Sequence, residues 1–582
     1  MNLHFARGGR TKSIAIAMSI IMALFVLRLF YIQVIQHEYY QRQADSEQMK
    51  KFVLHAHRGE IYTMDADTPT KIVMNETVYT IWVDPTEVQE PNKVADVLNK
   101  VAGGNVRDNF KQYITMPDTR YQVLARKVTR TQAELIKKEN LAGIGFDAVS
   151  QRVYPEGQLG AQVLGFVDNE GTGKYGFEQA NDTTLKGTDG LLKTVTDVRL
   201  VPLTVGDKNI NVPAKNGTNY VLTIDRNVQT KVEQALSDGM GKIGATQGSA
   251  LVMDPNTGKV LAMANLPSFD PSNLSAVTDL SALNNNIITN PYEPASVMKT
   301  VAMSAGVDKG AMTPDSTYVN TDSIVIDDKT IQNATKGQTG TITMQHALNW
   351  SLNTGSVTLA TWLGGGSINS TARDILYQYY HDKFHLGEKT GIELANEQGG
   401  TVVPPTEVEG NAIRYANMTF GQGLDITTLQ MATAFSAIIN GGVYRHPTVV
   451  AGTMSDDGQK FTATKQNPGE QIIKQSTSDT MKKMIYDARQ AFPSYHSSDR
   501  SGYYIGGKTG TAQTIENGKY VFDQTIATYV GFGGEVGKKP AYVVMIELSG
   551  PHKNFDGGHH ALPIFTDISN WMIDYLKLTP QG

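Results

Sequence analysis

The sequence contains no cysteine in its 582 residues. Thiol catalysis, disulfide bonds and zinc or iron–sulfur sites with cysteine ligands are therefore excluded. A strong charge of either sign is also missing, because 57 acidic and 52 basic residues leave a formal net charge of −5. This balance provides no general cationic surface for phosphate groups, so we expect no nucleic-acid partner.

Glycine and proline are not in excess, with 55 and 22 residues, which argues against a collagen-like or linker-dominated architecture. At about 150 residues per domain, the length predicts several domains. Because 40% of the residues are hydrophobic, the chain has enough apolar material for their cores, and we do not expect a disordered protein.

One long apolar run is present, at residues 14–35. A helix of about 22 residues matches the ~30 Å hydrocarbon core of a bilayer, so we predict a transmembrane anchor over residues 13–36. Residues 1–12 contain basic but no acidic side chains, which predicts a cytoplasmic N-terminus, a single pass through the cytoplasmic membrane and an exported remainder. A cleaved signal peptide is disfavoured because the run is too long and bulky residues stand at its end.

Arg28 lies inside this apolar run. A charge at the bilayer centre costs about 2.5–3.5 kcal/mol on insertion scales, although a long side chain near the outer end can extend to the interface. Two interpretations stay open: simple tolerance, and a polar contact with another membrane protein.

The exported part divides by its pattern at about residue 216. In residues 37–215, short strand-like runs such as 78–83 and 190–195 alternate with glycine and proline, and no nucleophile pair or metal spacing stands out. We predict a non-catalytic, strand-rich pedestal domain there, and a catalytic domain over residues 216–582.

The catalytic domain is expected to be α/β (α+β), with one antiparallel sheet flanked by helices and closed by both ends of the domain. At the start of the domain, the supporting elements are a strand at residues 220–224, a helix N-cap at Asp225 and a hairpin of residues 250–253 and 260–264. At its end they are strands at residues 526–531 and 541–548 and a helix with an apolar face of Phe565, Ile568, Met572 and Leu576.

The clearest chemical signal is a serine–lysine pair, Ser296 and Lys299, just after an expected helix start at Pro294. Residues three apart share a face of a helix. A serine hydroxyl is a weak nucleophile, and a neighbouring amine kept neutral by desolvation or by another cation can take its proton. Alone the pair is weak evidence, because about two such spacings are expected by chance in a chain this long.

A second serine and an asparagine follow, Ser351 and Asn353, in a largely helical stretch that they can interrupt. They offer a proton relay and an amide that can hold a substrate carbonyl or orient the lysine. Ser367 and Asn369 have the same spacing but follow three glycines in an expected loop. We therefore prefer Ser351 and Asn353.

The third element is the run Lys508, Thr509, Gly510 and Thr511. Glycine allows close backbone approach, the hydroxyls can hold a carboxylate, and an amide can complete an oxyanion hole. This run precedes the two closing strands, where an edge strand could flank the nucleophile. A similar run at residues 389–391 lacks the second hydroxyl and is expected to be a structural turn.

The three elements in this order are a signature of penicillin-binding proteins and β-lactamases. With them the chain resembles the class B, monofunctional penicillin-binding proteins over nearly its full length. Residues 78–85 favour the division-type branch, with the elongation-type branch as the alternative. Ala295 and Leu352 depart from the family, where glycine and serine are common. Further matching segments are residues 58–61, 152–157, 176–178 and 420–423, Thr427, Gln430 and residues 561–565.

The resemblance implies a peptidoglycan D,D-transpeptidase, which transfers the D-alanyl-D-alanine end of one stem peptide to an amine of a neighbouring stem. Ser296 would attack the carbonyl of the penultimate D-alanine, and Lys299 would act as its base. Ser351 would pass the proton to the departing D-alanine, Asn353 would position the donor peptide, and Lys508 would supply positive charge.

The same resemblance assigns the remaining groups of the site. Thr509 and Thr511, beside Gly510, would receive the terminal carboxylate, and the backbone amides of Ser296 and Thr511 would form the oxyanion hole. No metal or organic cofactor is implied. β-Lactams would acylate Ser296, and deacylation would be slow. Because a monofunctional enzyme must receive glycan strands, the expected protein partner is a polytopic membrane glycosyltransferase of the division machinery.

Three other functions fit parts of the sequence. Residues 502–509 satisfy the Walker pattern of NTPases, but Gly510 would interrupt the helix that a P-loop needs. A membrane-anchored β-lactam sensor and a serine β-lactamase would keep the same three motifs. Rapid release of the acyl group would favour the β-lactamase, whereas the large pedestal favours a wall enzyme.

The remaining polar features are expected to be structural. The histidine pairs His55 with His57 and His559 with His560 lack the helical spacing of metal sites, so we expect them in solvated loops. Residues 490–504, which include Tyr495 and His496, are expected to form a polar surface loop.

Overall fold

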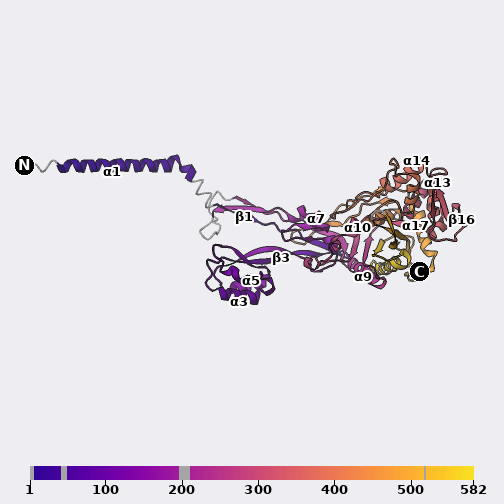
Figure 1. Ribbon diagram of the computed structural model, residues 1–582, viewed down its shortest axis with the longest axis horizontal. Coiled ribbons are helices and arrows are strands. Elements are labelled where there is room, and N and C mark those ends of the chain that lie inside the picture. The colour runs from indigo at the N-terminus through magenta and orange to yellow at the C-terminus, as the bar shows by residue number, and fades with distance from the viewer. Residues whose placement is uncertain (1–5, 41–48, 196–209, 517–518, 582) are drawn as a thin grey trace, which may run out of the picture. The chain divides into compact units, whose positions relative to one another are not determined.

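The computed structural model describes residues 6–40, 49–195, 210–516 and 519–581. Within these ranges the chain forms two compact units (Figure 1). The first unit is Met1–Arg58 with Lys186–Gly217, and the second is Gly59–Leu185 with Thr218–Gly582.

The first unit contains the N-terminal helix and a small sheet. Helix α1 (Ala6–Phe30) continues into a π-helical turn, η1 (Tyr31–Ile35). Within Gly9–Ile35, a stretch of 18 residues has a mean hydropathy of 2.3, and none of it is buried. The predicted apolar run is therefore a single helix, which is long enough and apolar enough to cross a membrane. Strands β1 (Met49–Leu54), β8 (Gly190–Val195) and β9 (Ile210–Val212) pair antiparallel, which confirms the strand predicted at residues 190–195.

The second unit contains a seven-stranded sheet in the order β19-β18-β10-β2-β3-β4, with β5 also paired to β3. Helices α3 (Pro91–Val101) and α5 (Arg130–Lys138) pack against the β3 and β4 end over a small apolar core around Leu98 and Ile136. The bounds of the strands are β2 Ile61–Asp65, β3 Thr68–Val83, β4 Gln122–Val128, β5 Ile144–Val153, β10 Asn219–Asp225, β18 Val450–Met454 and β19 Phe461–Ala463.

This sheet joins strands from both sides of residue 216. Strand β10 lies between β2, to which it is parallel, and β18, to which it is antiparallel. The Asp225 side chain accepts hydrogen bonds from the amides of Asn227 and Val228 and thereby caps α9 (Arg226–Ile243). The predicted strand, N-cap and helix are confirmed, and the β10–β2 pairing carries the seven-stranded sheet across the expected domain boundary.

The five-stranded sheet is antiparallel throughout, in the order β12-β11-β23-β22-β21. It confirms the expected hairpin and the expected closure by both ends of the domain. Strand β21 forms one edge. The bounds of the strands are β11 Gln247–Met253, β12 Val260–Leu266, β21 Gly506–Glu516, β22 Lys519–Gly533 and β23 Tyr542–Ser549.

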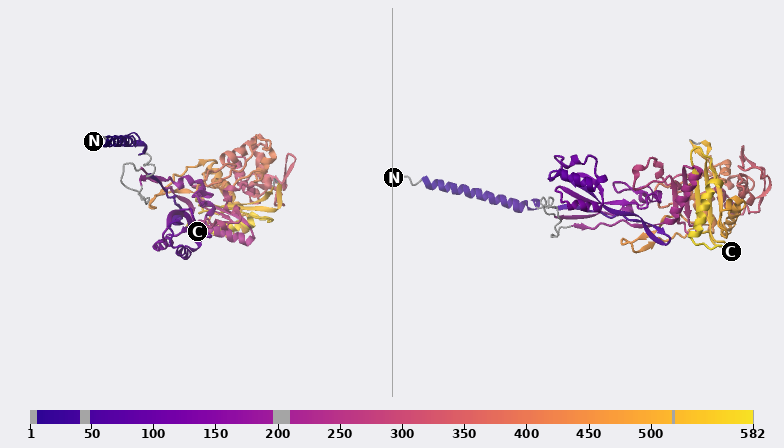
Figure 2. Two further views of the ribbon diagram at one scale, coloured as in Figure 1. Left: turned by 60° about the vertical axis from the view of Figure 1, so that its left-hand side comes forward. Right: turned by 90° about the horizontal axis from the view of Figure 1, so that it is seen from below.

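Successive residues of a strand point to opposite sides of a sheet. In this sheet apolar residues lie on both sides, so helices cover both faces. Ala250 and Val252 belong to the core beneath α9 and α19 (Leu562–Tyr575), whereas Leu251 and Met253 belong to the core of the opposite face. That face carries α11 (Lys299–Asp308), α16 (Thr428–Ile439) and α17 (Gln475–Gln490). Figure 2 (right) shows α19 beside the closing strands, in yellow.

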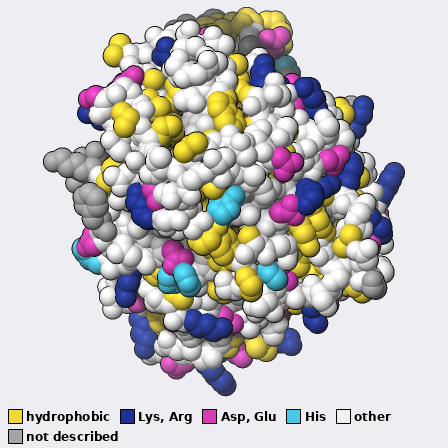
Figure 3. Space-filling model, turned by 90° about the vertical axis from the view of Figure 1, so that its right-hand side faces the viewer, with side chains coloured by type: hydrophobic (Ala, Val, Ile, Leu, Met, Phe, Trp, Pro, Cys, Tyr) yellow, Lys and Arg dark blue, Asp and Glu magenta, His cyan; other side chains and the backbone are white. Residues whose placement is uncertain are grey.

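The closing helix corrects one expectation. Phe565, Ile568 and Met572 are fully buried, but Leu576 is 37% exposed because α19 ends at Tyr575. On the face drawn in Figure 3, basic and acidic side chains are interspersed, in keeping with the near-balanced charge of the chain.

Candidate active site

Ser296 lies in a short 3₁₀ turn, η5 (Ala295–Met298), directly before α11. The preceding Ala295 has a left-handed backbone with φ of 52°, a conformation that costs a non-glycine residue about 1–2 kcal/mol. Its amide donates to the carbonyl of Gly421 at 3.0 Å. A Cβ atom on Gly421 would lie 2.1 Å from the Ala295 carbonyl oxygen, so this tight contact requires glycine at 421 and holds the turn in place.

Lys299 is completely buried, and its Nζ lies at the centre of the site. The distances from Nζ are 2.9 Å to Ser296 Oγ, 2.6 Å to the Ser351 carbonyl oxygen, 3.2 Å to Ser351 Oγ and 2.9 Å to Asn353 Oδ1. The Asn353 amide is oriented by its Nδ2, which donates to the Gln332 carbonyl at 2.8 Å.

These contacts suit a neutral amine, which has two N–H groups and one lone pair. The Ser351 carbonyl and the Asn353 side-chain oxygen can only accept, so they take both N–H groups. The lone pair is then left for the hydroxyl proton of Ser296. Burial is the main cause that holds the pKa of Lys299 well below its usual value, and repulsion from Lys508 is the second.

Ser351 lies in the break between α12 (Met344–Asn349) and α13 (Asn353–Leu363), with a left-handed φ of 55°. The predicted helical stretch is thus interrupted where expected. Lys508 Nζ donates to Ser351 Oγ at 2.9 Å and to the Thr509 carbonyl at 3.0 Å. The Ser351 hydroxyl therefore lies between two buried amines. Burial lowers the pKa of Lys508 to about 7.

The run from Lys508 to Thr511 forms part of the edge strand β21, which contacts the η5 turn. A Cβ atom on Gly510 would lie 2.2 Å from Thr528 Oγ1 and 3.1 Å from the Pro294 carbonyl oxygen. Glycine at this position lets the edge strand approach the nucleophile turn. Thr509 is partly exposed and Thr511 exposed, and Thr511 Oγ1 accepts from the Gly557 amide at 3.3 Å.

A cavity of about 440 Å³ contains all three motifs. Ser296, Ser351, Asn353, Lys508, Thr509 and Thr511 line it, and Trp350, Phe420, Phe492 and Tyr495 supply aromatic walls. These aromatic residues are missing from the sequence-based site. The expectation of a polar surface loop at residues 490–504 is wrong, because Pro493–His496 form a helical turn, α18, in which Tyr495 packs on Phe492 and faces the cavity.

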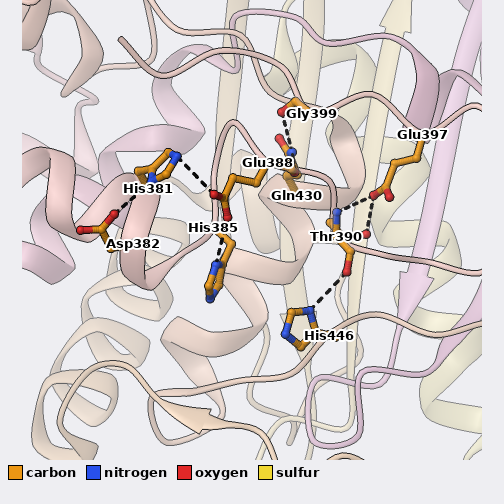
Figure 4. A network of polar contacts seen from close by, with 9 residues as sticks. All are labelled: His381, Asp382, His385, Glu388, Thr390, Glu397, Gly399, Gln430 and His446. Carbon is orange, nitrogen blue, oxygen red and sulfur yellow. Dashed lines mark hydrogen bonds and ion pairs between the residues drawn. The ribbon is translucent and has the colours of Figure 1, made fainter. Parts of the chain in front are cut away.

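The competing matches lie outside this cavity and have structural roles. Figure 4 shows that Glu397 accepts hydrogen bonds from the amide and hydroxyl of Thr390, at 2.7 and 2.5 Å. The alternative pair of Ser367 and Asn369 is also structural, since Asn369 Oδ1 accepts a hydrogen bond from the Ala372 amide and caps α14 (Ser370–Tyr377). Thr390 is therefore occupied by the Glu397 carboxylate, and Asn369 by the helix cap.

The Walker interpretation also fails. Lys508 lies within strand β21, paired to Val530 of β22, and no helix begins there. A P-loop lysine needs a helix that starts at that point.

The histidine pairs are mostly surface groups. His55, His57 and His559 are exposed, as expected, but His560 is partly buried in a π-helical turn, where it packs against Asp556. Among the residues that the structure describes, no group of three or more His, Asp or Glu side chains is arranged to hold a metal ion.

Two family models match the chain. Residues 248–570 match the penicillin-binding protein transpeptidase domain, and residues 53–222 match the penicillin-binding protein dimerisation domain. The first match covers the whole cavity described above, and the second covers most of the predicted pedestal.

Curated proteins and solved structures agree with these models. Penicillin-binding protein PbpB of Mycobacterium tuberculosis is 32% identical over 481 residues, 80% of this chain and 68% of that protein. Peptidoglycan D,D-transpeptidase FtsI of Escherichia coli is 27% identical over 96% of this chain and 91% of its own length. The crystal structure of penicillin-binding protein 3 of M. tuberculosis in complex with aztreonam superposes with a TM-score of 0.67 at 27% identity, covering 91% of this chain and 98% of that one.

Proposed function

The chain belongs to the class B penicillin-binding proteins, which join a dimerisation domain to a transpeptidase domain, and from this premise we propose how its residues perform the family's reaction. The chain is a peptidoglycan D,D-transpeptidase that forms a serine acyl-enzyme from a D-alanyl-D-alanine terminus and is a target of β-lactams. The observation that carries the proposal is the hydrogen bond of 2.9 Å between Ser296 Oγ and the buried, desolvated Lys299 Nζ.

In the acylation step, Ser296 Oγ attacks the carbonyl of the penultimate D-alanine and its proton passes to neutral Lys299. The C–N bond to the terminal D-alanine breaks, and the Ser351 hydroxyl delivers a proton to the departing nitrogen while it takes up the proton held by Lys299. Ser351 suits this relay because its Oγ lies 3.2 Å from Lys299 and 2.9 Å from Lys508. A neutral amine of a second stem then attacks the acyl carbon, the ester C–O bond to Ser296 breaks, and the amine's proton returns to Ser296 Oγ through Lys299.

The donor peptide is held by groups that face the same cavity. Protonated Lys508, Thr509 and Thr511 receive the terminal carboxylate, while Asn353 orients the peptide. The backbone amides of Ser296 and Thr511 form the oxyanion hole, each worth about 2.7–4 kcal/mol in the transition state. Among the residues that the structure describes, β21 is an edge strand, so its outer amides are available to a substrate.

Mass spectrometry after penicillin treatment tests this assignment. The full chain should gain one covalent adduct, which maps to the peptide that contains Ser296, and Ser296→Ala should gain none while staying folded. An adduct that persists in Ser296→Ala would move the nucleophile elsewhere. Rapid loss of the adduct with penicillin turnover would identify a β-lactamase instead.

The cellular role that we propose is septal wall synthesis during division, anchored by α1 with the N-terminus in the cytoplasm. Support comes from residues 78–85 and from the basic N-terminal flank. Depletion of the protein should give filamentous cells, whereas swelling and loss of rod shape would identify an elongation role.

The absence of cysteine makes the membrane orientation directly testable. A thiol introduced as Val325→Cys, at a site 62% exposed, should react with a membrane-impermeant maleimide in intact spheroplasts. A thiol introduced as Thr11→Cys should react only after permeabilisation. The reverse pattern would refute the orientation.

A further inference from the structure

A second cavity, of about 430 Å³, adjoins the catalytic one. Two segments of the chain contribute to both. Glu293 and Gly423 line the second cavity, whereas Ser296 and Gln422, a few residues away, line the first. A ligand in the second cavity therefore lies next to the nucleophile turn.

The second cavity is anionic. Its charged lining consists of Glu293, Glu409, Asp425 and a single cation, Arg414. The guanidinium of Arg414 is already engaged, since it donates to the Gly423 carbonyl at 2.9 Å and to Glu409 at 2.5 Å. Within the described part of the chain, neither Glu293 nor Asp425 forms an ion pair.

Glu293 is a fixed and desolvated carboxyl group. It is 6% exposed and accepts hydrogen bonds from the Gly423 amide at 2.6 Å and from the Tyr520 hydroxyl at 3.1 Å. Asp425 is partly buried, and among the described residues its carboxylate has no hydrogen-bond donor. Burial raises the pKa of both groups, a shift that a bound cation would offset.

The two cavities are electrostatically opposite. Protonated Lys508 attracts the anionic terminus of the donor peptide to the catalytic cavity and repels an ammonium group. The reaction nevertheless needs an amine as its second substrate. The anionic cavity beside Ser296 has the charge that such a substrate requires.

We propose that the cavity lined by Glu293 and Asp425 binds the protonated amine of the acceptor stem peptide before that amine enters the catalytic cavity. This acceptor subsite rests on the transpeptidase function proposed above and names the place of its second substrate. Glu293 and Asp425 hold the ammonium by charge-assisted hydrogen bonds, and Arg414 keeps Glu409 and the Gly423 carbonyl in place around it.

Partitioning of the acyl-enzyme tests the subsite in the full chain. The donor is a thioester analogue of the D-alanyl-D-alanine terminus, and the acceptor is a synthetic stem tripeptide with a free side-chain amine. The measured quantity is the ratio of aminolysis to hydrolysis at neutral pH, which does not depend on the rate of acylation. Glu293→Gln and Asp425→Asn should each lower this ratio about tenfold.

Two controls separate the subsite from a structural effect. Hydroxylamine is uncharged at neutral pH, so its aminolysis ratio should stay unchanged in Asp425→Asn. Glu407→Gln removes an exposed carboxylate that does not line the cavity, two residues before Glu409 in the sequence, and should leave both ratios unchanged.

Each outcome bears on the proposal. A loss confined to the cationic acceptor supports it, whereas an equal loss with hydroxylamine, or no loss with either acceptor, overturns it. If the unaltered chain forms no acyl-enzyme from the donor, the transpeptidase function itself fails, and that result is distinct because no partition ratio exists.

Discussion

At the scale of single residues, the two lysines need opposite protonation states. Lys299 must be neutral to take the proton of Ser296, while Lys508 must be charged to attract a carboxylate. Both amines contact the Ser351 hydroxyl, and both are buried. Each positive charge disfavours the other, so a charge on Lys508 helps to keep Lys299 neutral.

This arrangement predicts a bell-shaped pH profile for acylation by a fluorescent penicillin. Below its lowered pKa, Lys299 gains a proton and the rate falls on the acid side. Above about pH 7, Lys508 loses its charge, since burial lowers its pKa to about 7, and the rate falls on the alkaline side. The second-order rate constant, measured from pH 5 to 10, should show both limbs.

Lys508→Arg is the matched variant for the alkaline limb. A guanidinium stays charged throughout the accessible pH range, so this limb should disappear even if the larger group lowers the maximum rate. Identical profiles in the two proteins would show that Lys508 does not set the alkaline limb.

At the scale of the elements, the distance between strand β21 and the η5 turn decides whether the site is assembled. Gly510→Ala would place a methyl group 2.2 Å from Thr528 Oγ1 and 3.3 Å from Val297 Cγ1. The strand must then move away from the turn, and a displacement of about 1 Å costs up to ~100-fold in rate. We expect penicillin labelling to slow by about that factor with unfolding little changed.

The matched control is Gly241→Ala, in α9. A Cβ atom there meets nothing within 4 Å, and alanine favours a helix over glycine by about 1 kcal/mol. Its labelling rate should equal that of the unaltered chain. Equal rates in Gly510→Ala would mean that β21 tolerates the methyl group without moving.

A buried ion pair links two other elements, β5 and α7 (Gly176–Ala180). Arg152 Nε lies 2.7 Å from Glu178 Oε1, with side chains 4% and 0% exposed. Arg152→Met should lower the free energy of unfolding by about 3–5 kcal/mol, because it removes one member of a buried ion pair. Chemical denaturation of the detergent-solubilised chain measures this.

Two comparisons sharpen the prediction for the ion pair. Arg152→Met combined with Glu178→Leu should recover much of the loss, since both members of the buried pair are then replaced by apolar side chains. Lys137 and Glu134 form an exposed pair at 3.1 Å. Lys137→Met should lower the free energy of unfolding by at most about 1 kcal/mol. An equal loss at both pairs would contradict the effect of burial.

Local signals in the sequence explain which elements could be predicted. The N-cap at Asp225, the β11–β12 hairpin and the apolar strands of the central sheet all depend on neighbouring residues. The tie between Glu293 and Tyr520 spans 227 residues, and the pairing of β10 with β2 joins distant strands. A single sequence carries no signal for such pairings, so the acidic cavity and the sheet across residue 216 could only be seen in the structure.

The catalytic site shows the same division. Ser296, Lys299, Ser351 and Lys508 are recognisable because each belongs to a short motif. Tyr495 belongs to none, and its polar neighbours hide its contact with Phe492. Aromatic cavity walls are assembled from separate segments, so their residue types alone do not identify them.

At the scale of the whole molecule, α1 is an apolar surface without a partner in the described chain. None of its apolar run is buried. The one charged residue of residues 14–35 is Arg28, which lies 5.7 Å from the Tyr31 ring centroid. Arginine within a span commonly faces the interior of a helix bundle, where it pairs with a polar group. The polytopic glycosyltransferase expected as partner from the sequence would supply such a group within the bilayer.

Replacing residues 14–35 by an unrelated apolar span of equal length should therefore abolish co-purification with the polytopic glycosyltransferase. Arg7, Arg10 and Lys12 are retained, so insertion and orientation should not change. Arg28→Leu alone should weaken the complex if its charge contacts the partner, and should leave it intact if the charge is merely tolerated. A complex unaffected by the full replacement would place the contact in the exported part of the chain, and the anchor would then serve only to hold the enzyme at the membrane.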